Sequence, residues 1–115
     1  MKNLKISLLY DFYGSVLSET QKKVIEMYYN EDLSLAEIAE HAGISRQGVR
    51  DSIIRAEEHL LLLEEKLGLY EKAVQIKKIH EEMSQILILL QATAEKDETL
   101  ALIHSLSEAL QKLDS

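Results

Sequence analysis

The chain has 115 residues, the length of about one domain, and a formal net charge of −7. It contains no cysteine and no proline. The lack of cysteine excludes a disulfide scaffold, a cysteine-ligated zinc site and a thiol nucleophile. Because proline breaks helix interiors, its absence favours an all-helical chain. A protein with this negative net charge is not expected to bind nucleic acid over its whole surface, so any contact with nucleic acid must be local.

The sequence predicts neither a membrane span nor a secretory signal. The longest apolar run covers residues 86–90, far short of the roughly 20 residues needed to cross a bilayer. Asp11 interrupts the apolar stretch near the N-terminus, and no small-residue cleavage site follows it. We therefore expect a soluble, cytoplasmic protein without membrane insertion.

Apolar spacing predicts a first helix over residues 3–14, ended by Gly14. Its apolar residues are Leu4, Leu8 and Phe12, four apart, with Leu9 and Tyr13 alongside. Four tyrosines are expected to form the apolar wall of the N-terminal core: Tyr10, Tyr13, Tyr28 and Tyr29.

Two capping boxes predict the next two helices. In segments 18–21 and 34–37, a serine is followed three positions later by glutamine or glutamate. Each side chain of such a pair can bond to the backbone amide of the other residue. The boxes predict helices over 19–29 and 35–42, the second ended by a left-handed Gly43.

From residue 46 onward the sequence predicts three amphipathic helices, the first two with heptad spacing of their apolar residues. The first begins after Ser45 and ends at Gly68. The second spans about 70–91, and the third spans about 98–112. Their apolar stripes are Val49, Ile53, Ala56, Leu60, Leu63 and Leu67; Ile76, Ile79, Met83, Ile86 and Leu90; and Leu100, Ile103, Leu106, Leu110 and Leu113. The fold class is therefore all-α, with about six helices.

We divide the chain into a helix-turn-helix domain over 1–68, with an extended recognition helix, and a C-terminal helical hairpin over 69–115. The stripe that starts at Val49 is longer than one small three-helix core can cover. The hairpin adds two further apolar stripes, so we expect it to pair two copies into a homodimer. An antiparallel monomeric bundle of the last three helices is the alternative.

Residues 34–56 fit a helix-turn-helix motif. Ala39 is the small residue needed where the two helices cross, and Gly43, four positions on, tolerates the positive φ of the tight turn. Apolar residues flank the turn and the second helix: Ile38, Ala42, Ile44, Val49 and Ile53.

Polar and basic residues lie at the start of the second motif helix, the end that enters a DNA major groove. Arg46 and Arg50 can pair with guanine, and Gln47 can pair with adenine. Arg55 lies further back and is better placed for a phosphate. The Ser45 hydroxyl, with the free amides of the helix start, can also hold a phosphate.

No residue pattern predicts a metal site, a cofactor site or a catalytic centre. The four histidines are far apart, and adjacent glutamates on a helix point about 100° apart, so they cannot share a proton. No glycine-rich phosphate loop and no nucleophile–base pair is present. We therefore expect no enzymatic activity. The helices of the helix-turn-helix motif can also serve as a plain three-helix core.

Residues 18–57 resemble region four of bacterial sigma factors. The chain as a whole resembles the YlxM family of small helical proteins, on the segments DFYG at 11–14, DLSLAEIA at 32–39 and ISRQ at 44–47. This resemblance implies a role in the signal recognition particle pathway, with DNA or the particle's RNA as ligand and the particle's proteins as further partners. Glu31 makes the turn before the motif more acidic than DNA binding favours.

We therefore expect a non-enzymatic DNA-binding regulatory protein of the signal recognition particle pathway. The alternative is a protein–protein or RNA-binding adaptor of the same pathway whose helix-turn-helix does not bind DNA. An exposed face of Arg46, Gln47, Arg50 and Arg55 favours nucleic acid.

Overall fold

A computed structural model describes residues 2–114, and the described chain is all-α with six α-helices and no strand. The helices are α1 (Leu4–Tyr13), α2 (Glu19–Ile25), α3 (Leu35–Ala42), α4 (Arg46–Leu67), α5 (Leu69–Thr93) and α6 (Asp97–Gln111). Short helical turns follow α1, α2 and α6 at Gly14–Val16, Glu26–Asn30 and Lys112–Asp114. The predicted fold class is confirmed.

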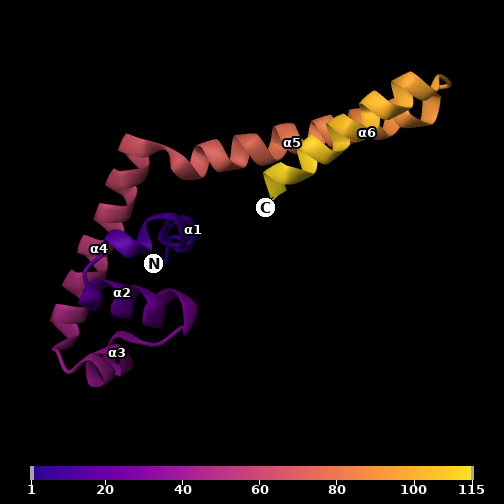
Figure 1. Ribbon diagram of the computed structural model, residues 1–115. Helices are drawn as coiled ribbons and strands as arrows, with labels where there is room; N and C mark the ends of the chain where they lie inside the picture. The colour runs from indigo at the N-terminus through magenta and orange to yellow at the C-terminus, as the bar shows by residue number, and fades with distance from the viewer. Residues whose placement is uncertain (1, 115) are drawn as a thin grey trace. The chain divides into compact units, whose positions relative to one another are not determined.

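The chain forms two compact units, Met1–Glu71 and Lys72–Ser115, so that the division falls within α5. In the first unit, α1, α2 and α3 all pack against α4 (Figure 1). Their core is apolar throughout and consists of Ile6, Leu9, Tyr13, Leu17, Val24, Ile25, Ile38, Val49, Ile53, Ala56 and Leu60.

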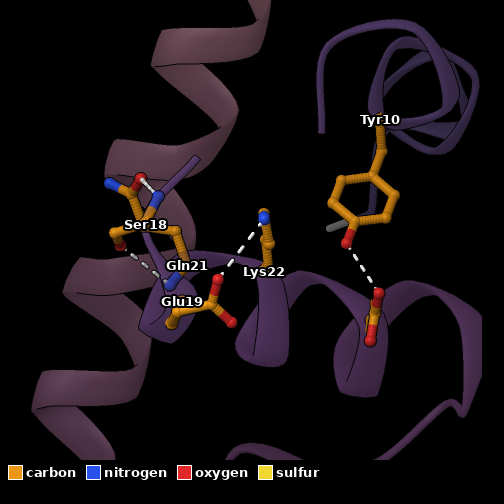
Figure 2. Close-up of polar contacts among 6 residues, drawn as sticks. Tyr10, Ser18, Glu19, Gln21 and Lys22 are labelled. Atoms are coloured by element: carbon orange, nitrogen blue, oxygen red, sulfur yellow. Dashed lines mark hydrogen bonds and ion pairs between the residues drawn. The ribbon is translucent and has the colours of Figure 1, made fainter. Parts of the chain in front are cut away.

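Both predicted capping boxes are present. The Ser18 hydroxyl accepts from the Gln21 amide at 3.2 Å, and the Gln21 side chain accepts from the Ser18 amide at 3.2 Å (Figure 2). Ser34 and Glu37 repeat this exchange at 3.1 and 3.0 Å. These four bonds satisfy backbone amides that a helix start leaves without partners, which is why α2 and α3 begin where the sequence predicts.

The predicted apolar face of α1 is correct only in part, since Leu9 and Tyr13 are buried as expected. Leu4, Leu8 and Phe12 are exposed by 82%, 45% and 42%, whereas the side of α1 that faces the core carries Ile6, Leu9 and Tyr13. Tyrosine hydroxyls explain the choice of side. Tyr13 reaches Glu64 on α4 at 2.6 Å, and Tyr10 reaches Glu26 at 2.7 Å (Figure 2), so the tyrosine-bearing side must face the other helices.

The helix predicted over 19–29 changes type part-way. It is α-helical to Ile25 and then makes one π turn over Glu26–Asn30. Because a π turn holds more residues than an α turn, neighbouring side chains point in closer directions. Tyr28 and Tyr29 accordingly both pack half-buried against the core, as the expected tyrosine wall requires.

The stripe of α4 is covered within its own unit, contrary to the prediction that it outruns one core. Val49, Ile53, Ala56 and Leu60 are at most 4% exposed. The reason is that α1, α2 and α3 each contact α4 and together span most of its length. Only Leu67, at the end, is half exposed. This stripe therefore gives no support to a dimer.

A side-chain cap unforeseen in the sequence holds the start of α5. The Glu64 carboxylate accepts from the amides of Tyr70 and Glu71, each at 3.0 Å. The Tyr13 hydroxyl donates to Glu64 and accepts from the Leu69 amide at 3.0 Å. The hydrogen bond from Tyr13, together with those two amides, holds the pKa of Glu64 below its usual value.

In the second unit, α5 and α6 run side by side in opposite directions as a hairpin (Figure 1). Its small core consists of Leu87, Ile103 and Leu110, with Ala94 packed beside them. The His80 ring lies 3.0 Å from the Leu110 carbonyl oxygen. Across residues 2–114, none of the helices combines the length and apolar character that a membrane span requires.

Candidate nucleic-acid interface

The helix-turn-helix motif is formed by α3, the turn at Gly43 and α4. Gly43 has a φ of 69°, the left-handed conformation predicted for it, and its amide donates to the Ala39 carbonyl at 3.0 Å. The amide of Ile44 shares the same carbonyl at 3.3 Å. Ala39 packs against the core cluster, as a residue at the crossing of the two helices should.

Ser45 caps α4, which places the next residues at a helix tip. Its hydroxyl oxygen accepts from the Gly48 amide at 3.0 Å. A Cβ atom at Gly48 would lie 3.1 Å from that oxygen, so glycine here leaves room for the cap. The amides of Arg46 and Gln47 precede this bond, so together with the Ser45 hydroxyl hydrogen they remain able to face a phosphate.

Three of the five predicted residues share one side of the tip. Arg46, Gln47 and Arg50 are all exposed and lie within about 100° of one another around the helix. Within residues 2–114, the two arginines make no hydrogen bond or ion pair. The side-chain amide of Gln47 instead donates to the Asp51 carboxylate at 3.0 Å.

Arg55 is exposed but does not join this group. It follows Arg46 by nine residues, and at about 100° per residue that separation amounts to half a turn of the helix. The structure therefore brings together Arg46, Gln47 and Arg50 and leaves Arg55 on another face of α4.

A groove of about 300 Å³ lies beside the basic tip. It is lined by Tyr28, Leu35, Arg50, Ile53, Ile54 and Glu57. The Tyr29 hydroxyl donates to the Glu57 carboxylate, and burial, followed by this bond, raises the pKa of Tyr29 to about 12. The sequence did not lead us to expect Ile54 beside the basic tip, although it follows Arg50 by four residues and therefore lies on the same side of α4.

Acidic residues limit the basic surface. Glu31, Asp32, Glu37 and Glu40, in α3 and the turn before it, are all exposed. Lys2 pairs with Asp32 at 2.7 Å and offsets one of these charges. The Ser34 amide and hydroxyl hold the pKa of Glu37 below its usual value. Within the motif, exposed positive charge is therefore limited to Arg46 and Arg50 at the tip of α4 and to Arg55 on another face.

Comparison with known proteins gives this geometry a family context. The model of one protein family, described as "Putative helix-turn-helix protein, YlxM / p13 like", matches residues 1–101. The chain belongs to this family, UPF0122. The predicted resemblance to YlxM proteins and the helix-turn-helix assignment are confirmed at that level, and the family description names no enzyme.

Two relatives in the UPF0122 family match over nearly their whole length, and a third matches over about two thirds of it. A UPF0122 protein of Halalkalibacterium halodurans is 41% identical over 113 residues, which cover 98% of this chain and 97% of the relative. One from Thermoanaerobacter pseudethanolicus is 38% identical over 96% of this chain and 95% of its own. One from Desulforamulus reducens is 55% identical over 74 residues, or 64% of this chain and 63% of its own.

Proposed function

We propose that this UPF0122 protein is a non-enzymatic regulator that binds duplex DNA by placing the tip of α4 in the major groove. One observation carries the proposal. Two exposed arginines without partners among the described residues stand at the N-terminal tip of the second helix of a helix-turn-helix. That end of the motif is the part that meets base edges in DNA-binding proteins.

The contacts follow from the chemistry of the side chains. Arg46 and Arg50 offer forked donors that match guanine O6 and N7. Gln47 can pair bidentately with adenine once its amide leaves Asp51. The Ser45 hydroxyl and the amides after it suit a phosphate, and Arg55, on another face, suits a more distant phosphate.

Duplex DNA fits this tip better than duplex RNA does, because the major groove of A-form RNA is too narrow for a helix. The resemblance to the YlxM family adds a cytoplasmic role in the signal recognition particle pathway, with the particle's RNA and proteins as further candidate partners. A protein–protein or RNA-binding adaptor is the second candidate function. The groove beside Arg50, to which Leu35 and Ile54 contribute apolar side chains, and the acidic residues around it favour that alternative.

Fluorescence anisotropy with labelled duplex DNA and structured RNA, at about 50 and about 200 mM salt, separates the two functions. We expect duplex DNA to bind more tightly. With about three phosphates neutralised per chain, affinity should fall about 40-fold between the two salt concentrations. Tight binding of structured RNA without binding of duplex DNA would replace the proposal with the adaptor function.

A further inference from the structure

The hairpin of α5 and α6 leaves its strongest apolar stripe uncovered. Ile76, Ile79, Met83, Ile86 and Leu90 repeat at heptad spacing along α5, yet they are between 38% and 56% exposed. The reason is that α6 packs beside a neighbouring stripe of α5, on which Leu87 is buried and His80 contacts Leu110.

The second helix of the hairpin also has an uncovered stripe. Its positions at 100, 103, 107 and 110 are half-buried or buried, so they mark the side that faces α5. Leu102, Leu106 and Leu113 lie off that side and are 72%, 47% and 59% exposed.

Both uncovered stripes lie on the same side of the hairpin. On each helix, the uncovered stripe is rotated away from the buried stripe by up to about 100° around the helix axis. Viewed from the N-terminus of its own helix, the direction of this rotation is the same for α5 and for α6. Because the two helices run in opposite directions, equal offsets bring both stripes to one face of the pair. Ile76 and Leu113 also line a common cavity with Ala73, Lys77 and His80, which places the ends of the two stripes together.

This apolar face is as large as a protein interface. Its eight side chains, between 38% and 72% exposed, present on the order of 700 Å² of apolar surface, close to the ~800 Å² that each partner buries in a stable complex. A two-helix hairpin with one open apolar face has the layout of half a four-helix bundle.

We infer that this face binds the same face of a second copy of the chain, which closes an antiparallel four-helix bundle around a two-fold axis. The inference concerns the C-terminal unit and holds whether or not α4 binds nucleic acid. It gives the expected homodimer a defined interface, on α5 and α6 rather than on the α4 stripe.

Charge selects the second copy as the occupant and sets its direction. At the open end of the hairpin, residues 72–80 and 108–114 carry four lysines against two acidic residues. At the loop end, residues 90–100 carry three acidic residues against one lysine. Two copies with their loops at opposite ends place basic ends beside acidic ends, whereas loops at the same end would bring like charges together.

A matched pair of substitutions on α5 tests the face. Ile86 lies on this face and is 56% exposed. Ile88 is 65% exposed but points about 200° away around the helix. Sedimentation equilibrium of the full chain at tens of micromolar should give a dimer, about twice 13.1 kDa, for the unchanged protein and for Ile88→Glu. Ile86→Glu should sediment as a monomer with unchanged helical circular dichroism.

A second variant on the face, Leu106→Glu on α6, should also be monomeric and guards against a fold defect specific to Ile86. A monomeric unchanged protein would overturn the inference, because the face then has no second copy on it. A dimer that survives both Ile86→Glu and Leu106→Glu, or one that only Ile88→Glu disrupts, would also overturn it.

Spin labels test the direction of pairing. The chain has no cysteine, so Glu95→Cys gives one label per chain, in the hairpin loop between α5 and α6. Loops at opposite ends of a bundle built on α5 should hold the two labels about 30 Å apart, at ~1.5 Å per helical residue. Labels closer than about 20 Å would contradict the antiparallel arrangement.

Discussion

At the tip of α4, the basic residues compete with an acid of their own helix. Asp51 accepts from the Gln47 amide, so Gln47 can pair with a base only after that bond breaks. The same carboxylate repels phosphate beside Arg46 and Arg50. Asp51 therefore acts against binding in two ways, one through a hydrogen bond and one through charge.

Replacement of Asp51 by alanine should strengthen DNA binding. Removal of an exposed charge with its hydrogen bond is worth about 0.5–1 kcal/mol, so we expect a two- to fivefold gain in affinity. Anisotropy titration with duplex DNA measures it. The matched control is Glu58→Ala, which removes an exposed charge two turns along α4 but leaves Gln47 bound. Equal gains in both variants would show that the bond to Gln47 has no part in binding.

The part of the candidate site that was predictable is the part determined by short-range sequence patterns of the helix-turn-helix motif. The spacing of Ala39, Gly43 and Ser45 fixes where α4 begins, so Arg46 and Arg50 follow at its tip. The bond between Gln47 and Asp51 was missed, although the two lie four residues apart on one helix, the spacing that brings side chains together. Arg55 was placed on the same face of the helix as the tip residues, although its separation from Arg46 amounts to half a turn.

At the scale of the helices, the junction of α4 and α5 depends on one carboxylate. Glu64 accepts from two amides of the first turn of α5 and from the Tyr13 hydroxyl. Its pKa is lowered from 4.5 in the folded protein, so its charged form is the one that stabilises the fold. That contribution is complete above pH 4.5 and is lost as the pH falls through the lowered folded value.

We expect Glu64→Gln to lower the urea midpoint of unfolding at pH 7, and we expect this deficit to shrink as the pH falls below 4.5. Urea titrations followed by circular dichroism at several pH values measure this. Glu65→Gln is the matched control, since Glu65 is exposed and its side chain bonds to no other described residue. A Glu64→Gln deficit that stays constant from pH 7 to pH 3 would contradict the role of the carboxylate.

The crossing of α3 and α4 depends on a small side chain. Ala39→Leu should overpack this contact and reduce the free energy of unfolding by roughly 1–3 kcal/mol. Ala36→Leu, one turn earlier on the exposed side of α3, should change it by less than about 0.5 kcal/mol. Denaturant unfolding of both variants checks the difference, and equal stability of the two would show that Ala39 is not at a tight crossing.

Helix boundaries were predictable because local interactions set them. Both capping boxes and the left-handed glycines at 43 and 68 act within a few residues. The buried face of α1 was predictable only in part, since it depends on which tyrosine hydroxyls meet the carboxylates of Glu26 and Glu64. The cap of α5 was missed because Glu64 precedes the amides it binds by six and seven residues, and a capping box spans three.

For the whole molecule, a net charge of −7 means that the protein as a body repels nucleic acid. Binding must therefore come from the few charges at the tip of α4, and it should be weak and sensitive to salt for one chain. Pairing through the C-terminal hairpin would double these contacts. The acidic surface and the small basic tip together predict specific rather than general affinity.

The most direct test of the DNA-binding claim compares two variants that each lose two positive charges. Arg46→Ala/Arg50→Ala changes the tip of α4, and Lys23→Ala/Lys66→Ala changes exposed lysines of α2 and of the far end of α4. With about 1–3 kcal/mol for each base contact, we expect the first to lower affinity for duplex DNA at least 30-fold, with an unchanged melting temperature. The second should change affinity about twofold or less. Equal losses in the two variants, or unchanged affinity in the first, would contradict a recognition role for α4.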